Sequence, residues 1–317
     1  MNLPPLLGPY GGLAPAGKQR FKDSEANALW FHGFNPEMFD LAVAAGKKAC
    51  VEFKTFRTDF SEHPELIPIG TDGKPIRCGK LVQGVCLSKK WYLEERTEEL
   101  KTALGTFSPA GIWLDYLTYG GWFEMPDPDL QDNCFCGDCI QDFCRATGID
   151  ADTPGAILAS HKAAWIHYKT DRMAAMAGIF SNIIKTHDPQ CLVGAYMCPW
   201  TPADFDGALM GIFGQDYTKF APHIDVFTPL IYCEKSGRPK SWASTWLKES
   251  KAYVPGAKKV QPILDFLDFP ESLTALSNSG RDCWGFQMFN GKFIFESDEY
   301  TDIFNRAAGS VGSACLL

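Results

Sequence analysis

Residues 111–117 read "GIWLDYL" and combine a buried-strand pattern with a carboxylate. Ile112, Trp113 and Leu114 are apolar residues that favour strands, and Asp115 follows them directly. A buried charge without a partner costs several kcal/mol or more. We therefore expect Asp115 at the mouth of a strand, near water, where its carboxylate is available for chemistry.

Seven further apolar runs resemble this one in being continuous rather than alternating, which is typical of parallel strands buried on both faces. The eight expected strands are 27–32, 48–54, 81–87, 111–117, 191–197, 224–232, 259–265 and 283–289. Helical patterns lie between them, near 35–47, 88–104, 154–187, 204–220, 239–253, 270–278 and 298–308.

This alternation predicts an α/β fold, a single (β/α)8 TIM barrel that forms one catalytic domain over residues 1–317. Residues 1–24 are expected to be an N-terminal extension. A doubly wound open sheet is the alternative. It is disfavoured because no G-x-G-x-x-G or G-x-x-x-x-G-K-[ST] motif follows a strand.

The charge and hydropathy of the sequence limit the kinds of partner that the protein is expected to bind. The net charge is −8 and no run of lysine and arginine exceeds two residues, so we expect no nucleic-acid partner. No apolar stretch approaches the ~18 residues needed to span a bilayer, so no membrane partner is expected. Homo-oligomerisation stays open.

The start of the chain lacks the pattern of a signal peptide. The whole chain has twelve cysteines, and several of them lie in apolar runs. Both features favour a cytoplasmic protein. A secreted or periplasmic protein whose signal peptide had been removed would look the same.

Acidic residues gather where the expected strands end. In a barrel of this type the chemistry takes place at the C-terminal mouth of the strands. The acids at these ends are Glu52, Asp115, Glu234, Asp265 and Asp268. Glycoside hydrolysis needs one carboxylic acid to protonate the leaving oxygen and a second carboxylate as nucleophile or base. We therefore expect a glycosidase acting on an oligo- or polysaccharide.

Aromatic and polar residues accompany these acids and could hold a sugar, since aromatic faces commonly line such pockets. The expected substrate-binding residues are Glu52, Lys54, Trp113, Tyr119, Trp122, Tyr196, Trp200, Tyr232 and Gln287.

Alternatives remain for several of these residues. Glu52 and Lys54 could form an ion pair inside the barrel, and Asp265 and Asp268 could cap a helix. A metal-dependent amidohydrolase barrel is disfavoured because the six histidines include no H-x-H pair. A non-catalytic carbohydrate-binding barrel would keep the aromatic residues and is the second reading of function.

The segment "DNCFCGDCIQDFC" holds Cys134, Cys136 and Cys139 at a spacing that can place three thiolates on one metal. Zinc prefers four ligands, and the fourth could be Cys144, Cys78 or Cys86. Free or disulfide-bonded thiols are the alternative to a structural zinc. No cofactor is expected for catalysis.

Residues 60–145 resemble a known group. The stretches "GIWLDYLTYGG" and "CFCGDCIQDF" are similar to hypothetical barrel glycoside hydrolases with a strand-four W/F-x-D motif followed by C-x-C-x-x-C-x-x-x-F. The cysteine spacing also resembles the zinc cluster of the family 42 β-galactosidases. Those enzymes have an Asn-Glu pair where this chain has Leu114 and Asp115, so their acid does not carry over.

A strand-four aspartate instead resembles the nucleophile of α-galactosidase-like and α-fucosidase-like retaining barrels. That likeness implies that Asp115 is the nucleophile, ionised and stabilised by donors such as Tyr119 or Lys54. By position alone it implies that Glu234 is the acid/base, with Asp265 as the reserve acid.

Overall fold

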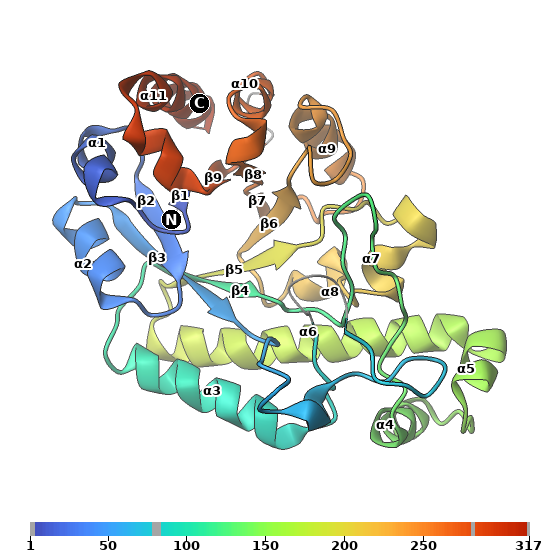
Figure 1. The fold of residues 1–317 in the computed structure, drawn as a ribbon. Coiled ribbons are helices and arrows are strands. Elements are labelled where there is room, and N and C mark those ends of the chain that lie inside the picture. Colours follow the sequence, from blue (N-terminus) through green and yellow to red (C-terminus); the bar gives the residue numbers. More distant parts are fainter. Residues whose placement is uncertain (1–3, 78–83, 280–282, 316–317) are drawn as a thin grey trace.

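The strands of this computed structural model, which describes residues 4–77, 84–279 and 283–315, form one parallel sheet that closes on itself (Figure 1). They are β1 (Leu6–Tyr10), β2 (Ala28–His32), β3 (Lys48–Lys54), β4 (Gly111–Asp115), β5 (Leu192–Met197), β6 (Val226–Ile231), β7 (Lys259–Val260), β8 (Ile263–Asp265) and β9 (Gly285–Phe289).

The sheet closes because β1 pairs with both β2 and β9, and β5 pairs with β6. The short strands β7 and β8 both pair with β6 and are separated only by Gln261 and Pro262. Together they occupy a single strand position in the barrel wall. The nine strands of the described residues therefore fill eight positions, and the architecture is the expected (β/α)8 barrel.

Helices surround the sheet in Figure 1, and the longest of them, α6, lies beside α3. They are α1 (Lys18–Asp23), α2 (Pro36–Ala44), α3 (Lys90–Leu104), α4 (Gly137–Thr147), α5 (Pro154–Ser160), α6 (Lys162–His187), α7 (Ala208–Gly211), α8 (Tyr217–Phe220), α9 (Trp242–Ser250), α10 (Glu271–Ser277) and α11 (Asp298–Cys315). Short 3-10 turns η1 (Pro15–Gly17), η2 (Pro64–Leu66), η3 (Asp204–Asp206), η4 (Phe266–Asp268) and η6 (Gly291–Glu296) complete the connections.

The first strand corrects the expectation of an N-terminal extension. Leu6–Tyr10 pair along their whole length with Gly285–Phe289, so they belong to the barrel wall. Gly8 permits the close approach to β2, because a Cβ there would lie 1.9 Å from the carbonyl oxygen of Ala28. A strand of five residues that contains both glycine and proline lacks the usual strand signal.

The expected strand at 81–87 is not found where the structure describes it. Residues 81–83 lie outside the described residues, and 84–87 form no strand. Val85, Cys86 and Leu87 are nevertheless buried, because this connection packs beneath the loop that follows β4. The expected helix at 154–187 is two helices, α5 and α6, which meet at His161.

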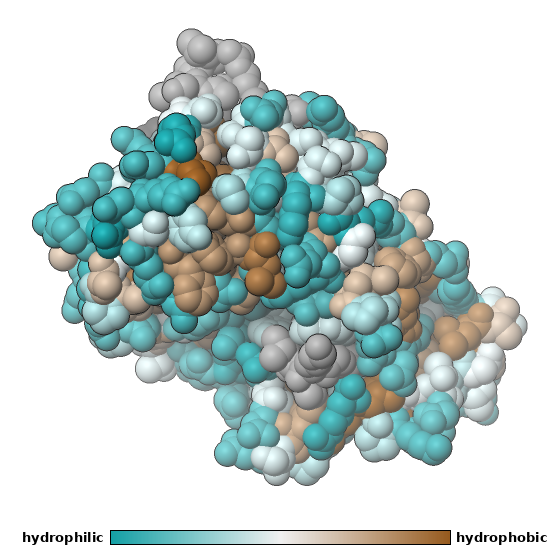
Figure 2. Space-filling view, turned by 45° about the horizontal axis from the view of Figure 1, so that its top comes forward, coloured by the Kyte–Doolittle hydropathy of each residue, from teal (hydrophilic) through white to brown (hydrophobic). Residues whose placement is uncertain are grey.

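The surface in Figure 2 is largely hydrophilic, with hydrophobic residues gathered in patches. Within the described ranges, no helix combines the length and the apolar character needed to cross a bilayer.

Candidate active site

A cavity of about 330 Å³ opens at the C-terminal ends of the barrel strands. Strands β1 to β6, β8 and β9 contribute to its wall or are followed by residues that do, and so does the loop after β4. The lining residues are Tyr10, His32, Glu52, Lys54, Arg57, Asp115, Tyr116, Thr118, Trp122, Phe123, Glu124, Tyr196, Cys198, Phe213, Gln215, Leu230, Tyr232, Lys235, Ile263 and Phe289.

Two of the expected acids meet in this cavity. Glu52 on β3 and Asp115 at the end of β4 have carboxyl groups that are hydrogen-bonded to each other. Glu52 is 1% exposed, and its Oε2 also forms a short contact with Nδ1 of His32 on β2. That nitrogen lies 3.3 Å from the hydroxyl of Tyr10 on β1. Four neighbouring strands, β1 to β4, thus assemble one hydrogen-bonded group.

The two carboxyls differ in acidity. Burial alone would raise the pKa of Glu52, but the hydrogen bond and charge of His32 and the hydrogen bond from Asp115 lower it. Burial raises the pKa of Asp115 well above its usual value, and the charge and hydrogen bond of Glu52 raise it further. The pair therefore holds one proton, which resides on Asp115, while Glu52 is the ionised partner.

A tight turn fixes the direction of Asp115. Tyr116 has a φ of 54°, in the left-handed region, and its backbone N–H donates to Asp115 Oδ1 at 2.9 Å. A bulky residue in that region costs about 1–3 kcal/mol, and such strain concentrates at functional sites. The turn holds the carboxyl at the cavity wall, where it stays partly exposed.

A third carboxylate, Glu124, lines the cavity from the loop after β4. Its Oε1 lies 3.7 Å from Nζ of Lys235, and the same ammonium lies 2.8 Å from Asp265 Oδ2. Lys235 also lies over the rings of Tyr232 and Phe289, 4.9 and 5.0 Å from their centroids. Lys235 therefore lies between Glu124, which lines the cavity, and the buried Asp265, which does not.

Phenol groups complete the wall. Burial, followed by neighbouring phenols and carboxylates, raises the pKa of Tyr10, Tyr196 and Tyr232 well above 10. Their hydroxyls therefore stay neutral and can donate hydrogen bonds to a polar ligand. Tyr232 and Phe289 stack with ring centroids 5.4 Å apart and give the cavity an apolar face.

Six of the expected site residues line this cavity. They are Glu52, Lys54, Asp115, Trp122, Tyr196 and Tyr232. The ion pair considered for Glu52 and Lys54 does not form among the described contacts. Glu52 is bound to His32 and Asp115 instead.

The structure does not bring Glu234 to the cavity wall. Its carboxylate is exposed and pairs with Lys240, with 3.1 Å between Oε2 and Nζ. Asp265 is fully buried and is also absent from the wall, because its Oδ1 accepts the N–H of Leu267 as the cap of η4. The capping alternative thus describes Asp265, whose other oxygen binds Lys235.

Four expected sugar-binding residues lie behind the wall. Trp113 is inside the barrel, where its Nε1 donates to Thr228 Oγ1 at 2.8 Å. Gln287 is also buried there, with its amide 2.8 Å from the Tyr196 hydroxyl. Tyr119 and Trp200 are buried among other side chains: Lys169 lies over the Tyr119 ring, and Trp200 packs on Phe205.

Sequence reasoning missed several lining residues, above all His32, Arg57, Glu124 and Lys235. Glu124 stands in the stretch "GGWFEMP" directly after the strand that carries Asp115. An acid in an aromatic segment beside a strand mouth is the signal that could have identified it.

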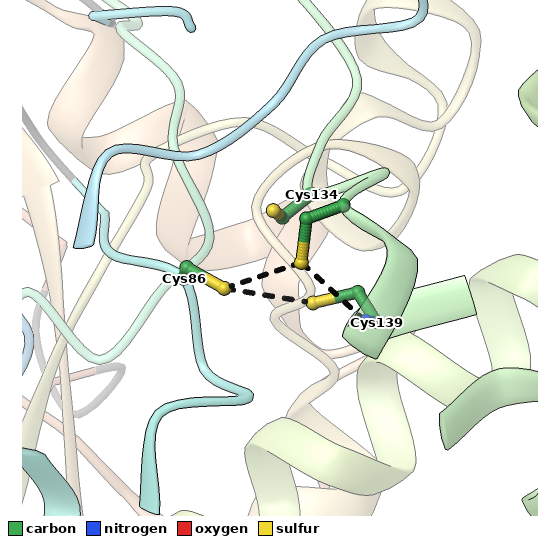
Figure 3. Close-up of side chains that lie close together, drawn as sticks. Cys86, Cys134 and Cys139 are labelled. Atoms are coloured by element: carbon green, nitrogen blue, oxygen red, sulfur yellow. Dashed lines mark hydrogen bonds between the residues drawn. The ribbon is translucent and has the colours of Figure 1, made fainter. Parts of the chain in front are cut away.

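The expected cysteine cluster forms and gains its fourth member. The sulfur atoms of Cys86, Cys134, Cys136 and Cys139 all lie within 4.8 Å of one another. Figure 3 shows that Cys86 approaches from a different segment than Cys134 and Cys139. Cys144 is not part of the cluster, because its Sγ donates to the carbonyl of Ala151. Cys78 lies outside the described residues.

The spacing of these sulfurs fits a metal ion. Cys86 Sγ lies 3.6 Å from Cys136 Sγ and 3.8 Å from Cys139 Sγ. Four sulfurs at ~2.3 Å from a tetrahedral zinc are about 3.8 Å apart, whereas a disulfide requires about 2 Å. The N–H of Ile69 donates to Cys134 Sγ at 3.2 Å, and the Ser88 hydroxyl lies 2.8 Å from Cys139 Sγ. Such donors support thiolate ligands.

The chain was compared with protein-family models, with curated proteins and with solved structures, and only the solved structures match. No protein-family model matches the chain, and neither does any curated protein. The glycoside hydrolase domain of PgaB (BpsB) from Bordetella bronchiseptica matches with a TM-score of 0.72 and 12% identity, over 94% of this chain and 98% of that one. All such matches are so distant that they establish the fold alone.

Two further structures extend the comparison. The β-galactosidase from Rahnella sp. R3 has a TM-score of 0.65 at 12% identity, over 98% of this chain and 57% of its own. The α-L-fucosidase isoenzyme 2 from Paenibacillus thiaminolyticus has a TM-score of 0.56 at 11% identity, over 98% of this chain and 49% of its own. The chain shares the (β/α)8 barrel fold of these three structures. The resemblance expected from the sequence is confirmed at the level of the fold.

Proposed function

We propose that the protein is a glycoside hydrolase that cleaves an oligo- or polysaccharide in the cavity at the barrel mouth. The observation that carries this proposal is the Glu52–Asp115 pair, two carboxyls that share one proton beside an aromatic wall. Glycosidases require a carboxylic acid that keeps its proton near neutral pH. The fold of the neighbouring structures supports the same class.

Asp115 is the general acid in this proposal rather than the nucleophile that the sequence resemblance implied. A nucleophile must be ionised, yet burial and the neighbouring charge of Glu52 raise the pKa of Asp115. Glu52 cannot replace it at the substrate, because it is 1% exposed and held by His32. Glu52 is therefore a positioning residue that keeps the proton on Asp115.

Glu124 supplies the second carboxylate. It lines the same cavity, with its Oε1 3.7 Å from the Lys235 ammonium. In a retaining reaction, Asp115 gives its proton to the glycosidic oxygen as the bond to the anomeric carbon breaks. Glu124 attacks that carbon and forms a glycosyl ester. Asp115 then takes a proton from water, whose oxygen displaces Glu124 and restores both carboxyls.

The remaining wall binds the sugar. Trp122 stacks on Phe123 with ring centroids 6.3 Å apart, and Tyr232 stacks on Phe289, so apolar ring faces are available to a pyranose. The neutral hydroxyls of Tyr10 and Tyr196 can bind its hydroxyl groups. Carbohydrate is therefore the proposed partner.

The four cysteines hold a structural zinc ion in this proposal. The thiol donor set and the sulfur spacing both fit zinc, and four protein ligands leave no open position for catalysis. The ion would tie the connection at Cys86 to the segment that follows the cavity loop of Trp122 and Glu124. Catalysis itself uses no cofactor.

The first test is a screen of 4-nitrophenyl glycosides and of plant, algal and bacterial polysaccharides. On the substrate that it identifies, Asp115→Asn should slow poor leaving groups far more than activated aryl glycosides, because only the former need protonation. Glu124→Gln should abolish both, since it removes the nucleophile.

Equal losses on both substrate types in Asp115→Asn would return the nucleophile role to Asp115. Sugar binding in this cavity without turnover of any glycan would establish the alternative, a non-catalytic carbohydrate-binding barrel. Proton NMR of the first anomer released distinguishes retention from inversion.

A further inference from the structure

Two basic side chains stand on the same side of the cavity as Asp115. Lys54 ends β3 and is the register partner of Asp115 on β4, and Arg57 follows three residues later. Both line the cavity and both are partly exposed to it. Lys54 lies on the strand that also carries Glu52, and Arg57 lies in the connection that follows it.

Neither of these cations has a carboxylate partner among the described residues. No hydrogen bond or ion pair holds the Lys54 ammonium within the described ranges. The Arg57 guanidinium donates to the Tyr116 hydroxyl at 3.3 Å and lies over the Tyr116 ring, 5.2 Å from its centroid. Lys235, on the other side, is by contrast paired with Asp265.

The nearby acids are already engaged. Glu52 is bound by His32 and by Asp115, and Asp115 carries the shared proton. The chain as a whole has a net charge of −8, yet these two cations at the cavity wall have no carboxylate partner within the described ranges. Cations that are partly withdrawn from water bind anions strongly when the geometry suits them.

We infer that the substrate is an acidic glycan whose carboxylate or sulfate group binds between Lys54 and Arg57, next to the scissile bond at Asp115. The guanidinium lies over the Tyr116 ring and donates to its hydroxyl, and its other N–H groups form a rigid fork that matches a carboxylate or sulfate. The ammonium adds a flexible point charge. This inference rests on the proposed function and names the substrate class for it.

The bound anion would also assist the acid. The Lys54 charge acts to lower the pKa of Asp115, against the larger effects of burial and Glu52. An anion on the substrate neutralises Lys54 and so helps to keep the proton on Asp115. Acidic substrates should therefore be cleaved up to a higher pH than neutral ones.

The test measures binding by calorimetry in an Asp115→Asn background, which prevents turnover. The probes are oligogalacturonides, alginate oligomers and sulfated galactan oligomers, each beside its carboxyl-reduced or desulfated counterpart. We expect at least one acidic oligomer to bind about tenfold or more tightly than its neutral counterpart, with an affinity that falls as salt rises. The carboxylate and sulfate arms show which anion is preferred.

Lys54→Met and Arg57→Met should each remove most of this preference, and Arg57→Lys should restore part of it. Lys22→Met is the matched control, because Lys22 is an exposed lysine on α1, remote from the residues that line the cavity. It should bind as the parent does. Thermal unfolding of every variant confirms that it is folded.

Equal affinity for acidic and neutral counterparts, or no binding of any acidic oligomer, overturns the inference. Asp115-dependent cleavage of a neutral glycan with no acidic preference would leave the proposed function standing and remove only the inference. Tight binding of an acidic oligomer that the wild-type protein never cleaves would support the anion site and contradict the proposed hydrolase function.

Discussion

Replacing Cys86 by serine should destabilise the protein by an amount that follows from chain topology. In the proposed zinc site Cys86 is joined through the metal to Cys134, which closes a segment of about 50 residues. The chain-entropy relation for such a cross-link gives about 4 kcal/mol in the free energy of unfolding. With an unfolding entropy of about 2.1 cal/mol/K per residue, this lowers the midpoint temperature of the 317-residue chain by about 6 °C.

The assay is differential scanning calorimetry of the zinc-loaded protein, with metal content measured by mass spectrometry. Cys144→Ser is the matched control, since this cysteine lies on the same helix as Cys139 but outside the cluster. We expect one zinc per chain in wild type and control. A chelator should lower the midpoint of both and should have little further effect on Cys86→Ser. Equal midpoints for the two serine variants, with no zinc in the wild type, would refute the reasoning.

Three further outcomes follow from the geometry. Glu234→Gln should keep kcat/KM within about twofold of wild type on the screened substrate, because this carboxylate is exposed and pairs with Lys240. A large loss would restore Glu234 as the acid. Trp122→Ala should raise KM about three- to tenfold with a smaller change in kcat, as expected for a lost stacking surface; an unchanged KM would contradict its place in the binding wall. Gly194→Ala should lower stability by about 1–3 kcal/mol in urea unfolding, because a Cβ there would lie 2.4 Å from the Trp113 indole; unchanged stability would show that the barrel interior can adjust.

The barrel could be predicted because most of its strands are buried on both faces and therefore appear as continuous apolar runs. The same signal failed at 84–87, where Val85 and Leu87 are buried in a connection rather than in a strand. It failed again at β1, whose Gly8 and Pro9 weaken the strand pattern. Apolar runs report burial, and burial alone does not distinguish a strand from a packed loop.

The candidate site was predictable only where one strand supplies the information. Asp115 could be found because the acid closes an apolar run at a strand end. Its partnership with Glu52 and His32 depends on the lateral pairing of β2, β3 and β4, which one strand's sequence does not encode. Glu234 also follows a strand, but the turn after β6 directs it to Lys240 and solvent.

The central claim is that Glu52 keeps the catalytic proton on Asp115. The pH dependence of kcat/KM for wild type and Glu52→Gln, on one substrate with a poor leaving group, tests it most directly. The basic limb of this profile reports the pKa of the acid in the free enzyme. Replacing Glu52 removes a charge that raises the pKa of Asp115, so the limb should move to lower pH. Because burial, the larger cause, remains, the limb should stay above the usual range of an aspartic acid. A limb that stays in place or moves to higher pH would contradict the account.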